Sequence, residues 1–281
     1  MRTSSASLRP DLKTTGLLGR VIIGTLFGVA VFLLIMFTPL PFLVLLVAAW
    51  SVLATLEFIK LLRIAEIYLN PWFLSILNVL IISAAWRGWL PGFLIAPLAI
   101  VFIAAVVITD VKPRIPVYNT FILIYLGFLP AYLIMLKSLA LEHAISLWLV
   151  MFPLLLTWTN DTAAWGIGKL FGRHKLTPSL SPNKTWEGFI AGLVCSAALA
   201  APFLKLFHPF SDLAWPYLAV IGIGLGTLSQ TGDLFESIFK RAVGIKDTSN
   251  ILGEHGGFLD RIDSLLFTIP AWYYLVLFYL R

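Results

Sequence analysis

The chain has 281 residues, of which 59% are hydrophobic and 12% are charged, and its mean hydropathy is +0.93. A soluble domain carries roughly 25% charged residues, so this composition excludes an ordinary soluble globular protein and indicates that lipid covers the apolar surface. The net charge of +6 fits basic loops near anionic lipid, and we find no nucleic-acid-binding motif. With one cysteine, an intrachain disulfide is excluded.

The chain begins with a polar and basic stretch, residues 1–15, which we expect to be a cytoplasmic lead. It does not resemble a secretory signal, because the apolar run that follows is long and lacks a clear cleavage site of small residues. We predict that residues 16–144 form N-terminal transmembrane helices that provide scaffold and lipid access. Within them, Glu57 is interpreted as an i, i+3 partner of Lys60 at a helix end.

Nine apolar runs follow, separated by prolines, glycines and charges. A bilayer core of ~30 Å needs roughly 20 apolar residues in a helix. The third run is short, so it and the fourth are also compatible with a hairpin that does not fully cross. We predict an all-α fold, a polytopic membrane bundle of about nine transmembrane helices without a β domain. The predicted helices are residues 16–37, 41–60, 71–87, 91–109, 117–137, 145–165, 187–206, 214–238 and 262–280.

The basic residues predict which side of the membrane each loop faces. If the N-terminus is cytoplasmic and the helices alternate, all but four of the 20 Lys and Arg residues fall in cytoplasmic segments, as the positive-inside rule requires. We expect the membrane to be a bacterial cytoplasmic (inner) membrane, with the active site facing the cytoplasm. Two polar segments, 160–188 and 233–264, then face the cytoplasm, and we predict that residues 145–281 form a catalytic region around them. The four exceptions are Arg87, Lys137, Lys205 and Arg281.

The first polar segment begins near the end of the sixth predicted helix. Asn160 and Asp161 lie at membrane depth or at its surface, where a charged group is usually functional. Three glycines after them permit close approach of the backbone. An ordinary positive-inside loop is the alternative interpretation, but the run SPNKTWE (Ser181 to Glu187) is too specific for a charged spacer. The basic residues of this segment are Lys169, Arg173, Lys175 and Lys184.

The second polar segment holds six of the chain's 14 acidic residues in about a ninth of its length, between two apolar runs. Charge this dense beside hydrocarbon is costly and usually functional. Asp233, Ser237 and Arg241 are spaced i, i+4, i+8 and share one face of a helix, and Asp260 and Asp263 do the same at i, i+3. A solvated loop whose charges are paired for solubility is the alternative.

Converging carboxylates in this segment suit a hard divalent cation. We expect Mg²⁺, with Mn²⁺ as an alternative, and one or two ions. Asp233, Asp260 and Asp263 are the best candidate ligands, because Asp233 closes one predicted helix and the other two open the next. Asp247 is a weaker candidate, since a helix cap or an ion pair with Lys246 explains it equally well.

Basic residues interleaved with these carboxylates suit a polyanion such as a nucleoside triphosphate. Lys240, Arg241 and Arg261 are placed to offset its charge, and Lys246 is expected to act on it as well. His255 is suited to donate to a phosphate oxygen or to position a water molecule.

The run SIFKRAVGIKDTSNILGEHGGFLDRID, Ser237 to Asp263, resembles the signature of the phosphatidate cytidylyltransferases, also called CDP-diacylglycerol synthases. That signature reads S-x-x-K-R, then K-D, then H-G-G-x-x-D-R-x-D. The run from Asn160 to Gly188 is similar to the family's upstream motif. Two departures occur, Ala163-Ala164-Trp165 in place of Gly-Ala-Tyr and Glu254 in place of a common Gly, and neither removes a charged group.

The resemblance implies transfer of a cytidylyl group from CTP to phosphatidate, giving CDP-diacylglycerol and pyrophosphate for phospholipid biosynthesis. The implied partners are CTP, phosphatidate and membrane lipid, without nucleic acid, and a homodimer is compatible with it. Lys175 and Lys184 are then expected to act at least partly on phosphatidate, and Arg261 and Lys246 on the triphosphate. The predicted substrate-binding residues are Asp161, Lys175, Ser181, Lys184, Thr185, Ser237, Lys240 and Arg241, and the predicted catalytic residues are Asp233, Lys246, His255, Asp260, Arg261 and Asp263.

Three other functions are alternatives. A CTP-dependent lipid-alcohol kinase, such as a polyprenol kinase, would use a similar nucleotide site but release CDP. A CDP-alcohol phosphotransferase would begin its motif with D-G-x-x-A-R, which is absent here. An ion-coupled transporter typically has inverted repeats with broken helices in both halves, whereas the polar residues here are concentrated in the C-terminal half.

Overall fold

The computed structural model describes residues 17–88, 90–107, 112–246, 248–249 and 256–281. The described chain is helical almost throughout, which confirms the predicted all-α class. It also contains one small two-stranded sheet, which the sequence did not predict. The predicted lead, residues 1–15, lies outside the described residues.

The N-terminal half consists of helices that begin and end close to the predicted breakers. They are α1 (Leu17–Phe37), α2 (Leu40–Ile64), α3 (Pro71–Trp86) and α4 (Leu90–Val107). Proline in the first turn suits a helix start because the missing N–H would have no partner there, and α2 and α3 both begin this way. Asn70 caps α3 by accepting a hydrogen bond from the backbone N–H of Phe73 at 3.1 Å.

A single long rod follows. It joins α5 (Arg114–Ile122), a six-residue π-helical stretch η1 (Leu123–Phe128) and α6 (Leu129–Glu142). With this rod counted once, the described residues form nine long helical segments, in agreement with the predicted number.

The C-terminal half contains α7 (Trp148–Phe171), β1 (Lys175–Thr177), β2 (Ser181–Thr185), α8 (Trp186–Lys205), α9 (Trp215–Ala242), the short 3₁₀ helix η3 (Leu259–Arg261) and α10 (Leu265–Leu280). Two helices extend past their predicted ends, α7 to residue 171 and α9 to residue 242. The prediction that Asp233 closes its helix is therefore wrong, because Asp233 lies more than two turns before the end of α9.

The molecule is an integral membrane protein. Within the described parts of the chain, four segments are long and apolar enough to cross a bilayer by length and composition. They are α2, the rod from α5 to α6, α8 and α9. Helix α3 has 16 residues, fewer than the roughly 20 of a full span, so full crossing by α3 and α4 stays a prediction.

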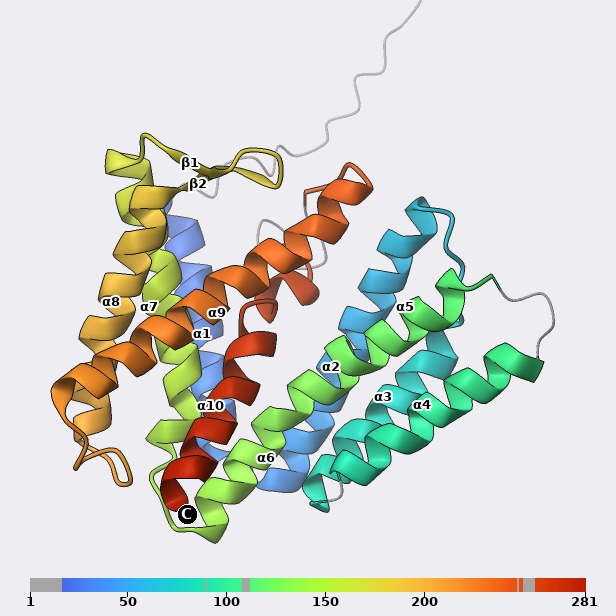
Figure 1. Ribbon diagram of the computed structural model, residues 1–281, viewed down its shortest axis with the longest axis horizontal. Coiled ribbons are helices and arrows are strands. Elements are labelled where there is room, and N and C mark those ends of the chain that lie inside the picture. Colours follow the sequence, from blue (N-terminus) through green and yellow to red (C-terminus); the bar gives the residue numbers. More distant parts are fainter. Residues whose placement is uncertain (1–16, 89, 108–111, 247, 250–255) are drawn as a thin grey trace, which may run out of the picture.

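The helices form two groups with α10 between them (Figure 1). Helices α7 and α8 lie side by side, and α9 crosses them obliquely in the direction of α2 and α5. The sheet and the end of α9 lie at the same end of the molecule, opposite the C-terminus.

Asn160 joins α7, α8 and α9. Its side-chain amide donates to the carbonyl of Gly226 at 2.7 Å, and its oxygen accepts from Gln230 at 2.7 Å. A Cβ on Gly192 of α8 would stand 2.2 Å from that same oxygen, so the close packing requires glycine. Asn160, which the sequence suggested as functional, therefore has a structural role that fixes where the neighbouring Asp161 lies.

Candidate active site

A polar pocket of about 810 Å³ lies where α7, the sheet, α9 and the segment 260–264 meet. The two sequence segments that carry the predicted site thus converge from different helices. Every predicted site residue within the described parts of the chain lines this pocket. They are Asp161, Lys175, Ser181, Lys184, Thr185, Asp233, Ser237, Lys240, Arg241, Lys246, Asp260, Arg261 and Asp263. Asp247 and His255 lie outside the described residues.

The sheet forms one wall of the pocket. Strands β1 and β2 pair antiparallel, with Lys175 opposite Thr185. Thr185 is buried and caps α8, because its hydroxyl oxygen accepts from the N–H of Gly188 at 3.2 Å. A Cβ on Gly172 would stand 2.2 Å from the carbonyl oxygen of Gly168, so the turn from α7 into the sheet requires glycine. These contacts fix the sheet, and with it the position of Lys184 on β2.

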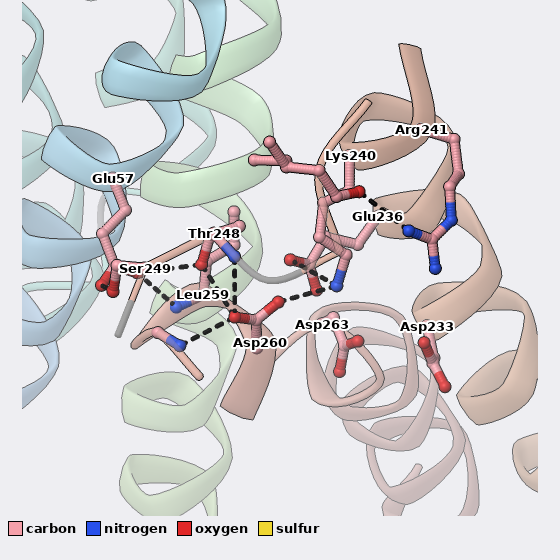
Figure 2. A network of polar contacts seen from close by, with 12 residues as sticks. Glu57, Asp233, Glu236, Lys240, Arg241, Thr248, Ser249, Leu259, Asp260 and Asp263 are labelled. Atoms are coloured by element: carbon pink, nitrogen blue, oxygen red, sulfur yellow. Dashed lines mark hydrogen bonds and ion pairs between the residues drawn. The ribbon is translucent and has the colours of Figure 1, made fainter. Parts of the chain in front are cut away.

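Two carboxylates lie close together at the pocket, Asp233 on α9 and Asp263 just before α10 (Figure 2). They meet because α9 passes against the backbone there: a Cβ on Gly232 would stand 2.6 Å from the carbonyl oxygen of Asp263. Burial, together with the nearby negative charge of Asp233, raises the pKa of Asp263 to about 6. Lys184 forms an ion pair with Asp233 at 2.8 Å.

Asp260 has a different environment, although it is only three residues from Asp263. One carboxylate oxygen accepts from the ammonium of Lys240 at 2.7 Å. The other accepts from the backbone N–H and the hydroxyl of Thr248, at 3.1 and 2.9 Å, and from the N–H of Gly257 at 2.7 Å. Figure 2 shows this network.

These contacts decide the charge of Asp260. Burial alone would raise its pKa, but Lys240 and the N–H donor outweigh that effect and lower the pKa to about 2. Lys240 also pairs with Glu236 at 3.2 Å. Asp260 is therefore a charged anchor whose oxygens are engaged by protein donors, whereas Asp263 lies against another carboxylate.

The carboxylates at the pocket can be compared with the ligands that the predicted Mg²⁺ requires. Among the residues that the structure describes, no group of three or more His, Cys, Asp or Glu side chains is arranged to hold a metal ion. Mg²⁺ usually binds through only one or two carboxylates, together with waters and substrate phosphates. Asp233 and Asp263 fit that requirement, since a cation between them would offset their mutual repulsion. Asp260 fits it less well because its oxygens already accept four hydrogen bonds.

The predicted cations also differ from one another. Arg241 donates to the carbonyls of Leu180 and Ile245, at 2.8 and 2.9 Å, so it fastens the turn of the sheet to the end of α9. Lys240 is held between carboxylates. Lys246 is exposed on the pocket wall.

A model of the cytidylyltransferase family matches residues 18–279. The chain belongs to the cytidylyltransferase family.

Individual relatives match a smaller part of the chain. It is similar to proteins named phosphatidate cytidylyltransferase from Staphylococcus saprophyticus, at 46% identity over 121 residues, and Staphylococcus haemolyticus, at 47% over 121 residues. A third, from Staphylococcus aureus, is 48% identical over 122 residues. Each match covers 43% of this chain and 46% of the relative, so it spans less than half the length of the curated relatives.

In this cytidylyltransferase family member, the interpretation of one buried acidic residue, Glu57, from the sequence was wrong. The pairing of Glu57 with Lys60 at a helix end was the wrong interpretation, because Glu57 is 1% exposed and its carboxylate accepts from Ser249 and Leu259, near the site. The signal was present in the sequence, since an acidic residue inside an apolar helix is costly and usually functional. Among pocket-lining residues, Trp165, Asn183 and Gln230 were also not selected as candidates.

Proposed function

We propose that the protein transfers a cytidylyl group from CTP to phosphatidate, giving CDP-diacylglycerol and pyrophosphate for phospholipid biosynthesis. The reaction would take place at the cytoplasmic face of a bacterial inner membrane. The observation that carries this proposal is the single pocket that gathers the carboxylates and cations of both segments. The family and the names of the relatives support it.

The reaction depends more on offsetting the negative charges of the two substrates than on a strong base. The attacking group is a phosphate monoester, whose second pKa is about 6 by analogy with phosphoserine, so it is mostly a dianion at neutral pH. Its oxygen bonds to the α-phosphorus of CTP, and the bond from that phosphorus to the bridging oxygen breaks as pyrophosphate leaves. Two anions must approach each other, and fixed cations lower the cost of that approach.

We assign Mg²⁺ to Asp233 and Asp263, with Mn²⁺ as a substitute. When bound, the ion would neutralise charge on the phosphate oxygens of CTP. Lys184, paired with Asp233 at 2.8 Å, then lies beside the triphosphate. Asp260 holds Lys240 and the backbone around residue 257 in place. A second ion would require ligands beyond this pair.

The lipid side of the reaction is assigned to a second cavity. An apolar cavity of about 250 Å³ lies among α1, α2, α6, α7 and α10, and Arg261 lines both this cavity and the polar pocket. An acyl chain in the apolar cavity would bring the phosphate of its own lipid to Arg261. The proposal therefore reverses the division of roles expected from the sequence, with Arg261 on phosphatidate and Lys184 on the triphosphate.

One assay tests the function. The purified protein is incubated with labelled CTP, phosphatidate and Mg²⁺ in lipid vesicles, and products are separated. We expect CDP-diacylglycerol, and its loss on chelation of the metal. Release of CDP instead, with a lipid alcohol as acceptor, would support the kinase alternative, and absence of any product would refute the proposal.

A kinetic comparison tests the division of roles. Arg261→Ala should raise the KM for phosphatidate more than that for CTP, and Lys184→Ala should do the reverse. Each substrate is varied at saturation of the other. The opposite pattern would restore the assignment expected from the sequence.

A further inference from the structure

Glu57 is a buried carboxylate that the proposed chemistry does not use. It lies on α2, two turns before the end of that helix, and is 1% exposed. Burying a carboxylate is costly unless hydrogen bonds compensate it. An apolar residue at this place would avoid the cost, so the contacts of Glu57 should explain its presence.

Those contacts are with the segment that follows α9 (Figure 2). One oxygen of Glu57 accepts from the hydroxyl of Ser249 at 2.5 Å. The other accepts from the N–H of Leu259 at 3.0 Å. A Cβ on Gly257 would stand 2.6 and 2.8 Å from these oxygens, so the backbone of residue 257 passes directly against the carboxylate. Glu57 therefore joins two stretches that lie ten residues apart in the chain.

The same two stretches are held from the other side by Asp260. Thr248 and Gly257 both donate backbone N–H groups to Asp260, at 3.1 and 2.7 Å. The Thr248 hydroxyl lies 2.9 Å from Asp260 and 3.4 Å from Glu57, so its one proton serves Asp260 better. Two carboxylates, one from α2 and one from the site segment itself, thus hold the same two stretches, residues 248–249 and 257–259.

A second contact from α2 reinforces this attachment. The indole N–H of Trp50, two turns before Glu57, donates to the carbonyl of Phe258 at 2.9 Å, and the two rings pack edge to face. Phe258 and Leu259 directly precede Asp260 and Arg261. Helix α2 therefore fixes the backbone immediately before the residue that lines both cavities.

We propose that Glu57 is a positioning residue: by fastening Ser249 and Leu259 to α2, it sets the placement of Asp260 at the polar pocket and of Arg261, which lines both cavities. This inference rests on the proposed function for its kinetic test, but not for its structural test. It gives helix α2, far from the signature in sequence, a direct part in the geometry of the site.

The kinetic test uses three variants of Glu57. Glu57→Ala removes both acceptors, and we expect kcat to fall about 10- to 100-fold, the usual scale for losing a group that orients functional residues. Glu57→Gln should recover most of the activity, because its amide oxygen accepts from Leu259 while its NH₂ donates to the Ser249 hydroxyl. Glu57→Asp is too short to reach both and should resemble alanine. Glu142→Ala, an exposed glutamate at the end of α6, is the control and should stay within about two-fold of wild type.

The structural test needs no substrate. Limited trypsin digestion should cut Glu57→Ala faster than wild type after Lys246, while cleavage after Arg173, at the start of the sheet, keeps its wild-type rate. Equal acceleration at both places would indicate general destabilisation and overturn the inference, as would a kcat of Glu57→Ala within about two-fold of wild type. If the wild-type protein lacked the proposed activity, the digestion would still decide whether Glu57 fastens this segment.

Discussion

Two lysines at the site form ion pairs that differ mainly in burial, and this difference allows a sharp prediction. Lys240 lies between Glu236 and Asp260, and its side chain is 9% exposed while theirs are 1% and 7% exposed. Lys184 pairs with Asp233 at 2.8 Å, but these side chains are 24% and 37% exposed. Substitution of either lysine by methionine keeps a similar length and removes the charge.

The expected costs follow from these environments. Removing one partner of a buried pair leaves an uncompensated charge and costs about 3–5 kcal/mol, a large part of a typical total stability of about 5–15 kcal/mol. Lys240→Met leaves Glu236, which is 1% exposed, without its cation, while Asp260 keeps its other three hydrogen-bond donors, so we expect about the lower figure. Lys184→Met breaks a solvated pair, for which the cost is about 0–1 kcal/mol.

Thermal unfolding of both variants in the same detergent measures the difference. At roughly 2–4 °C per kcal/mol, Lys240→Met should melt about 6 °C or more below wild type, and Lys184→Met should stay within about 4 °C. Lys184→Met should nevertheless lose activity, because Lys184 lies at the proposed triphosphate site. Equal melting temperatures for the two variants would refute the assignment of Lys240 as a buried structural cation.

Three further predictions concern the metal, the helix packing and the orientation. Asp263→Asn should lower turnover at least ~10²-fold at saturating Mg²⁺, the scale of one key electrostatic contact; near-full activity would remove Asp263 from the proposed ligands. Gly192→Ala should destabilise by about 1–3 kcal/mol through overpacking against α7, whereas Gly224→Ala, which meets nothing within 4 Å, should melt like wild type; matching losses would contradict this packing. A cysteine in place of Lys246 should react only from the cytoplasmic side and one in place of Lys205 only from the other, and outside labelling at position 246 in intact cells would reverse the orientation.

The helices were predictable because hydropathy and breakers act locally. Runs of apolar residues bounded by proline and glycine gave the number of helices, but not all of their ends. Helices α7 and α9 continue beyond their apolar runs because the polar residues there face the pocket instead of lipid. The sheet escaped prediction because the strand SPNKT has no apolar alternation. Its position depends on the close contact at Gly172 and on the pairing of His174 with Glu187 at 2.7 Å.

The members of the candidate site were predictable from two motifs, but their individual roles were not. Asp260 and Asp263 look equivalent at i, i+3, yet one is surrounded by donors and the other lies beside Asp233. That difference arises from Gly232 and Gly257, which bring distant backbone close. The part played by Glu57 depends on contacts with residues 192 and 202 positions away, which no local pattern encodes.

The length and tilt of α9 bear on whether a lipid must leave the bilayer to reach the pocket. Its 28 residues span about 42 Å at 1.5 Å per residue, more than the ~30 Å of hydrocarbon, and Figure 1 shows it crossing its neighbours obliquely. We expect a long, tilted helix to keep its polar last turns near the level of the lipid phosphates, whereas an upright helix of the same length would place them in solvent. Extracting an acyl chain costs about 0.8 kcal/mol per CH₂. In the proposed reaction, a pocket lined by such a helix would let CTP reach the lipid, so both phosphatidate and CDP-diacylglycerol would keep their chains in the leaflet.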